Sequence, residues 1–209
     1  MALLNFPAII IKTPLKLMDI KFLASLINKC GAATVFLNGA GGLNSFIVKN
    51  ALDCELKRGL DYGLIIDFRG RSESALDSDV ISAAEMNFKF IFLDEPGPKS
   101  KPALCGISSY GFISGIKKKY AAKFKIIVQN CFLHKNDEEL LAMQLESGAD
   151  LAAVRPGPAR PEFLAKYKDR AAFLKSLTAA ELDGPGFRGC ETGALYELDY
   201  SSAAQEGLI

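Results

Sequence analysis

Charged side chains recur where apolar runs of the sequence end. One run ends in Asp67, with Arg69 and Arg71 just beyond it, and another is followed by Asp94 and Glu95. Carboxylates at such positions can act as general acids or bases, and arginines can bind phosphate or carboxylate groups. A salt-bridged rim and a helix cap are the alternative explanations for the same residues.

Three further runs end in polar residues. Asn38 and Gly39 open a glycine-rich segment, Gln129 and Asn130 close another run, and Arg155 follows a third. Glycines let the backbone approach a phosphate or a flat ring, although they also suit a plain turn. Arg155 fits an anion contact, or else a cap over a gap between strands. These residues are therefore candidates for binding a ligand.

The apolar runs must be strands if these side chains are to meet. They are nearly continuous rather than alternating, which is typical of parallel strands covered on both faces. Amphipathic helical stretches separate them. In such folds ligands bind outside the carboxyl ends of the strands, so the candidate residues share one edge. The predicted strands cover residues 8–11, 33–37, 63–67, 88–93, 124–129 and 149–154.

This order predicts a (β/α) TIM-barrel-like α/β fold, shortened or incomplete relative to eight units; an open doubly wound sheet is the competing architecture. Six units already reach about residue 175, and a full barrel usually takes about 250 residues. We expect a barrel-like domain over 1–182 and a tail over 183–209 whose strand candidate, 194–198, could add an edge strand. The sheet would be incomplete, or closed by the tail or by a second subunit.

Composition narrows the function classes. The formal charge is +1, from 25 basic and 24 acidic residues, so neither nucleic acid nor a membrane surface is an expected partner. No apolar run reaches the roughly 20 residues of a membrane span, and the first residues do not resemble a signal peptide. Five widely spaced cysteines and one histidine, His134, predict a reduced, cytoplasmic protein without a metal centre.

Four segments together resemble the methylenetetrahydrofolate reductase family. Residues 67–86 and 92–96 resemble a strand end that opens a helix and the following strand end. Residues 38–42 and 148–156 are similar to the family's glycine-rich second strand end and to its sixth strand. The segments occur in the family's order and with similar spacing.

The resemblance implies a flavin-dependent oxidoreductase acting on a folate or pterin one-carbon substrate. It would carry FAD, with FMN as the second possibility, across the carboxyl ends of the strands. Glu95 and Asp94 would be catalytic, and Gln129 and Arg155 would bind the folate-like substrate. The cofactor-binding residues would be Asn38, Gly39, Asp67, Arg69, Arg71 and Asn130.

Three positions depart from the family pattern. The first strand ends in Lys12, where the family has the glutamate that protonates the folate; the family's strand-four aspartate falls on Glu95; and Arg155 replaces a glutamine. The family's later barrel units are also largely missing. The absent acid and the missing units support another hypothesis. The chain could then be an inactive relative, a scaffold that binds a ligand or a partner subunit. A homo-oligomer or a partner subunit would cover the incomplete barrel. The strand-end arginines alone would also suit a barrel enzyme acting on a phosphorylated metabolite.

Overall fold

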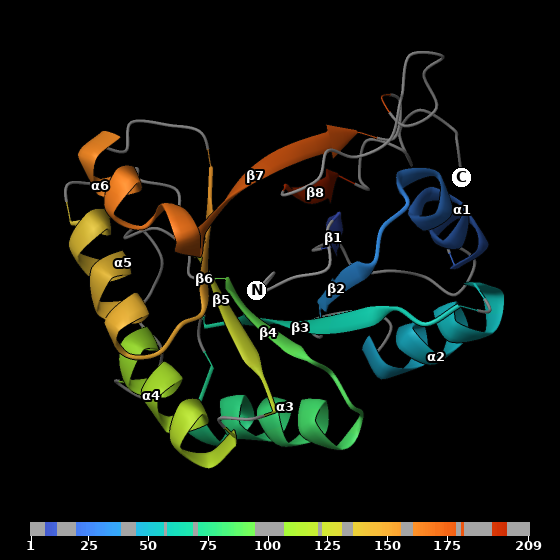
Figure 1. Cartoon of the computed structure of the whole chain (residues 1–209). Coiled ribbons are helices and arrows are strands. Elements are labelled where there is room, and N and C mark those ends of the chain that lie inside the picture. Colours follow the sequence, from blue (N-terminus) through green and yellow to red (C-terminus); the bar gives the residue numbers. More distant parts are fainter. Residues whose placement is uncertain are drawn as a thin grey trace. The chain divides into compact units, whose positions relative to one another are not determined.

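The computed structural model describes residues 7–11, 20–38, 45–56, 58–68, 71–94, 107–120, 123–130, 136–155, 161–178, 181 and 194–199. Strands and helices alternate along the chain (Figure 1). The strands are β1 (Ala8–Ile11), β2 (Thr34–Asn38), β3 (Asp61–Asp67), β4 (Phe90–Asp94), β5 (Lys125–Asn130), β6 (Leu151–Val154), β7 (Ala171–Thr178) and β8 (Leu195–Asp199). The helices are α1 (Ile20–Cys30), α2 (Ser45–Leu56), α3 (Glu73–Glu85), α4 (Ser109–Tyr120), α5 (Asp137–Glu146), α6 (Pro161–Lys166) and the short 3₁₀ turn η2 (Lys168–Arg170).

The strands are ordered β1 to β8 in a closed barrel. β1 pairs in parallel with both β2 and β8, and β8 pairs in parallel with β7. The predicted TIM-barrel-like α/β fold is therefore confirmed. Of the alternatives for the end of the chain, closure by the tail is the one observed, because the predicted strand at 194–198 is β8. β7 was not predicted.

The chain divides into two compact units, residues 1–64 with 174–209 and residues 65–173. In the first unit β1 lies between β2 and β8, with Ala8 opposite both Thr34 and Leu195. The outer helices α1 and α2 pack against each other. Helix α1 buries a stripe at helical spacing, Ile20, Leu23, Ala24, Leu26, Ile27 and Cys30. It stops at Gly31, whose φ of 63° suits glycine at a helix end.

The second unit holds the β4–β5–β6 part of the sheet with helices α3, α4 and α5. Figure 1 shows α4 and α5 side by side at the left, and these two helices are in contact. Helix α3 begins at an N-cap, where the Ser72 hydroxyl accepts a hydrogen bond from the Ala75 N–H at 3.3 Å. The apolar strands provide the core of this unit, including the fully buried Phe92, Ile126 and Val128.

No helix within the described ranges has the length and apolarity that a membrane span requires.

Candidate functional site

Asp94 and Gln129 lie at the same level near the carboxyl ends of two neighbouring strands of the second unit. Leu93 of β4 lies opposite Val128 of β5, so the next residues along the two strands are Asp94 and Gln129. Residues opposite each other in parallel strands point to the same face of the sheet. Asp94 is half-buried, whereas Gln129 is only 7% exposed, and both have polar or electrostatic partners. A carboxyl group and an amide group therefore share one face at this edge.

Arg155 follows the next strand at the same edge. Gln129 lies opposite Ala153, and Asn130 lies opposite Val154, the last residue of β6. Arg155 comes directly after Val154, is half-buried and has an interaction partner. Three adjacent strand ends thus provide an acid, an amide and a guanidinium group.

Asp67 is a second acidic residue, at the end of the strand next to β4. It is the last residue of β3, the neighbour of β4 in the sheet, and it is half-buried. Carboxylates can hold a proton or a divalent cation, amides donate and accept hydrogen bonds, and a guanidinium pairs with a carboxylate in a bidentate way. The strand ends of β3, β4, β5 and β6 therefore carry the groups needed to bind and polarise a small acidic molecule.

Arg71 lies just past the edge formed by these strand ends. Its Nη2 donates to a carboxylate oxygen of Asp79 at 2.7 Å and to the carbonyl oxygen of Ala75 at 3.2 Å. Both acceptors belong to α3, and the side chains of the ion pair are 26% and 30% exposed. Burial raises the pKa of Asp79 above its ordinary value, and Arg71 opposes that shift. Arg71 thus binds the first turns of α3.

Four predicted site residues remain. Asn38 is the half-buried last residue of β2 in the first unit, and it too has a partner. Gly39, Arg69 and Glu95 fall outside the described residues. Within the described part of the chain, no three His, Cys, Asp or Glu side chains come together as a potential metal site.

Two polar clusters were not predicted from the sequence. Asp150, just before β6, accepts hydrogen bonds from the ammonium of Lys117 and, at 2.8 Å, from the backbone N–H of Ile126. In the first unit, Asp53 binds the hydroxyl of Tyr62 at 2.7 Å and Lys49 at 2.8 Å. Burial, and then the hydrogen bond to Asp53, raise the pKa of Tyr62. The i,i+4 spacing of Lys49 and Asp53 was the one sequence signal for these contacts.

No protein-family model and no curated protein matches the sequence. Solved structures do match the fold. Oxaloacetate acetylhydrolase with the product oxalate is 15% identical (TM-score 0.58), over 96% of this chain and 78% of that one. 2,3-Dimethylmalate lyase, a PEP mutase/isocitrate lyase superfamily member, is 12% identical (TM-score 0.58), over 98% of this chain and 79% of that one. Phosphonopyruvate hydrolase with oxalate and Mg²⁺ is 13% identical (TM-score 0.56), over 96% of this chain and 78% of that one.

These matches correct the resemblance to methylenetetrahydrofolate reductase. The matching structures are hydrolases and lyases, and one of them, 2,3-dimethylmalate lyase, is a PEP mutase/isocitrate lyase superfamily member. The predicted flavin-dependent folate oxidoreductase and its FAD or FMN cofactor are therefore wrong, and so is the reductase family assumed for the inactive-relative alternative. At this identity the likeness itself shows the fold alone.

The quoted motifs have structural reasons of their own. In the segment 148–156, Gly148 has a φ of 110°, which favours glycine, and Asp150 holds Lys117 and the start of β5. In the segment 67–86, Arg71 and Asp79 bind each other across the first turns of α3. These residues hold helix and strand ends of this barrel in place.

Proposed function

We propose that this protein is a lyase or hydrolase acting on a small carboxylic acid at the carboxyl ends of β3 to β6. The observation that carries the proposal is the register that sets Asp94 beside Gln129 and Arg155 on adjacent strand ends. The matching structures support it, since 2,3-dimethylmalate, oxaloacetate, oxalate and phosphonopyruvate are all small carboxylates.

Each group has a role that its chemistry suggests. Arg155 binds a carboxylate of the substrate, because a guanidinium matches that group in charge and geometry. Gln129, nearly buried, orients the substrate through a hydrogen bond. Asp94 takes up or delivers a proton at the reacting carbon or oxygen.

A divalent cation fits the donors at this edge. Asp67 ends the strand next to β4, and its carboxylate could hold Mg²⁺ with water and substrate oxygens filling the other positions, which leaves Asp94 to handle the proton. When bound, the cation would polarise a substrate oxygen as a Lewis acid. The residues of the chain would still bind the substrate and handle its protons.

The first experiment measures oxalate binding by calorimetry, with and without Mg²⁺. We expect Arg155→Gln to weaken binding about tenfold to a hundredfold, since a hydrogen bond to a charged group contributes about 1.5–3 kcal/mol. The exposed Lys118 on α4 provides the matched control, and Lys118→Gln should leave the affinity unchanged.

Turnover is then assayed with oxaloacetate, 2,3-dimethylmalate and phosphonopyruvate. Asp94→Asn should lower the rate about a hundredfold or more, in the range of lost general acid–base catalysis. Glu146→Gln, at the exposed last residue of α5, is its control. The proposal fails if no small carboxylate binds, or if Arg155→Gln binds oxalate like the wild type.

A further inference from the structure

The charges of this chain are unevenly distributed along its sequence. Residues 96–136 contain eight lysines and neither aspartate nor glutamate, although the whole chain has 24 acidic residues and a net charge of only +1. The remainder of the chain is therefore net negative. Because lysines are rarely buried, the fold must place this local excess of positive charge on a surface.

The structure gathers several of these lysines at the amino-terminal edge of the second unit, where β4 and β5 begin. Lys118 and Lys119 lie in the last turn of α4. Lys123 follows that helix, and Lys125 opens β5. Lys89, directly before β4, joins them because its carbonyl oxygen accepts a hydrogen bond from the Lys125 N–H at 2.9 Å. All five residues are exposed, and we call them the lysine patch.

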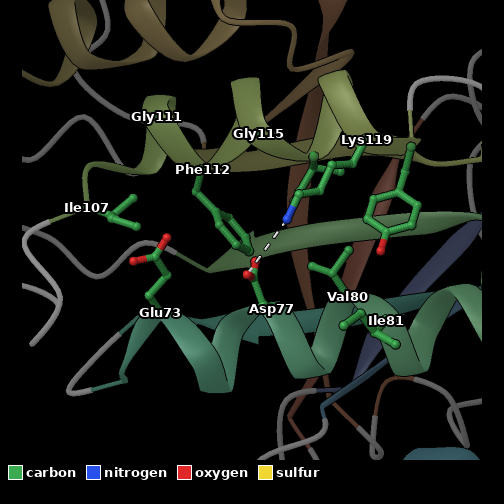
Figure 2. Close-up of a pocket in the computed structure, with 11 residues that line it drawn as sticks. Glu73, Asp77, Val80, Ile81, Ile107, Gly111, Phe112, Gly115 and Lys119 are labelled. Atoms are coloured by element: carbon green, nitrogen blue, oxygen red, sulfur yellow. Dashed lines mark ion pairs between the residues drawn. The ribbon is translucent and has the colours of Figure 1, made fainter.

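Part of the charge in this region stabilises the fold. The half-buried Lys117 donates a hydrogen bond to the Asp150 carboxylate, which also lies 3.5 Å from the Lys125 ammonium. The carboxylate of Asp77 is 3.9 Å from the Lys119 ammonium, and Figure 2 shows this pair reaching from α3 to α4. Cations in the last turn of a helix also stabilise its carboxyl end.

These roles do not account for the whole patch. Stabilisation of a helix end cannot explain Lys89, Lys123 and Lys125, which lie outside α4. Like charges held close together repel each other, so stability alone does not favour collecting them. The exposed acids that end the helices α3 and α5, Glu85 and Glu146, reduce the excess of positive charge without cancelling it.

We propose that the lysine patch is a docking surface for an acidic segment of another protein, one that carries several aspartate or glutamate side chains close together. Carboxylates are the groups that ammoniums of this region already meet in the structure, at Asp77 and Asp150. The patch contains no arginine, the residue whose planar fork suits phosphate and nucleic-acid recognition. Lysines act as flexible point charges, which fits a run of carboxylates without a fixed geometry.

The patch is separate from the candidate catalytic site. Lys89 and Lys125 lie where β4 and β5 begin, whereas Asp94 and Gln129 lie near the carboxyl ends of the same strands. Each exposed ion pair contributes little and is screened by salt. The segment must therefore engage several lysines at once, and its affinity should fall steeply as the ionic strength rises.

Fluorescence anisotropy of a labelled decaglutamate peptide, titrated with the full chain, tests the proposal. We expect saturable binding that weakens about tenfold or more between about 20 mM and about 500 mM salt. The double variant Lys118→Glu/Lys123→Glu should weaken binding about tenfold at low salt, because two attractions become repulsions. Lys21→Glu/Lys29→Glu is the matched control, since both lysines are exposed on α1 and the change in net charge is the same. It should bind within about twofold of the wild type.

Other anions identify the class of partner. A single-stranded DNA of matched charge and vesicles that contain phosphatidylserine should bind more weakly than the peptide, and tighter binding of either would overturn the acidic segment as the occupant. No binding of the peptide at low salt, or an equal loss in the two double variants, would overturn the patch as the site. Oxalate affinity should be unchanged in Lys118→Glu/Lys123→Glu, and a parallel loss of oxalate binding would contradict a separate surface.

Discussion

At the scale of single residues, the pair of Arg71 and Asp79 shows how a strand-end arginine can be committed to the scaffold. Asp79 is partly buried, and its pKa is raised by that burial despite the neighbouring guanidinium. Removing Arg71 would leave a partly buried carboxylate without its counter-charge, which is more costly than losing an exposed ion pair.

We therefore expect Arg71→Ala to lower the free energy of unfolding by about 1–3 kcal/mol at neutral pH. Without Arg71 the folded-state pKa of Asp79 rises further. A raised folded-state pKa favours the fold below the unfolded pKa, and this contribution is lost as the pH rises through the folded pKa. The deficit should thus shrink as the solution is acidified. Urea unfolding at pH 7.5 and pH 4.5 measures it, and an equal deficit at both values would contradict this account.

The strand ends could be predicted from the sequence, whereas the partners of the side chains there could not. Asp67, Asp94 and Gln129 all lie at the predicted edge, because an apolar run that stops at a polar residue marks where a buried strand leaves the core. The contact from Arg71 to Asp79 joins residues eight positions apart, so it depends on the course of α3 between them and on the rotamer of the arginine. The local sequence pattern shows neither of these.

At the scale of elements, Asp150 joins three of them. Its carboxylate accepts from Lys117 of α4 and from the N–H of Ile126 in β5, and it lies 3.5 Å from the ammonium of Lys125. Its side chain is 15% exposed and stands directly before β6. One carboxylate therefore ties the end of a helix to the starts of two strands.

Asp150→Ala should lower the free energy of unfolding by about 2–4 kcal/mol, because it leaves a backbone donor and a partly buried ammonium without their acceptor. Asp150→Asn keeps an oxygen for the N–H of Ile126 and should cost about half as much. Chemical denaturation of both variants measures the difference. Equal losses for the two variants would contradict this account, because the oxygen that asparagine keeps for the Ile126 N–H would then contribute nothing to stability.

β7 escaped prediction because its residues do not form a continuous apolar run. Buried and exposed side chains are mixed along it, and Phe173 is 53% exposed while Ala172 and Leu174 on either side are buried. The criterion that found the other strands was coverage on both faces. A strand with exposed side chains such as Phe173 interrupts that apolar run. Residues 171–175 therefore fall at the end of the predicted sixth βα unit and not in a strand of their own.

At the scale of the whole molecule, the first and last strands depend on each other. β8 pairs with β1 through residues 195–197 and with β7 through residues 195–199, so a segment near the end of the chain completes the pairing of a strand near its start. The sequence showed a strand candidate in the tail but could not show its neighbours, because pairing between distant segments leaves no local pattern. Short strand-end motifs likewise identified a barrel and the wrong family, since residues in them such as Arg71, Asp79 and Asp150 hold helix and strand ends.

This closure predicts that a single buried charge in β8 disrupts the fold. Leu195 is fully buried and lies opposite Ala8 and Leu174. Leu195→Asp loses the burial of a leucine, about 2–5 kcal/mol, and also buries a carboxylate without a partner. The sum approaches the whole stability of a typical domain, which is about 5–15 kcal/mol.

The variant should lose its near-ultraviolet circular dichroism and unfold at much lower urea concentrations than the wild type. Phe173→Asp is the control on the neighbouring strand, because a side chain that is already 53% exposed loses little by becoming charged. If Leu195→Asp unfolded at the same urea concentration as the wild type, the pairing of β8 with β1 and β7 would not contribute to the stability of the fold. A large loss with Leu195→Asp and none with Phe173→Asp would show that burial within the closed sheet, rather than added charge, sets the cost.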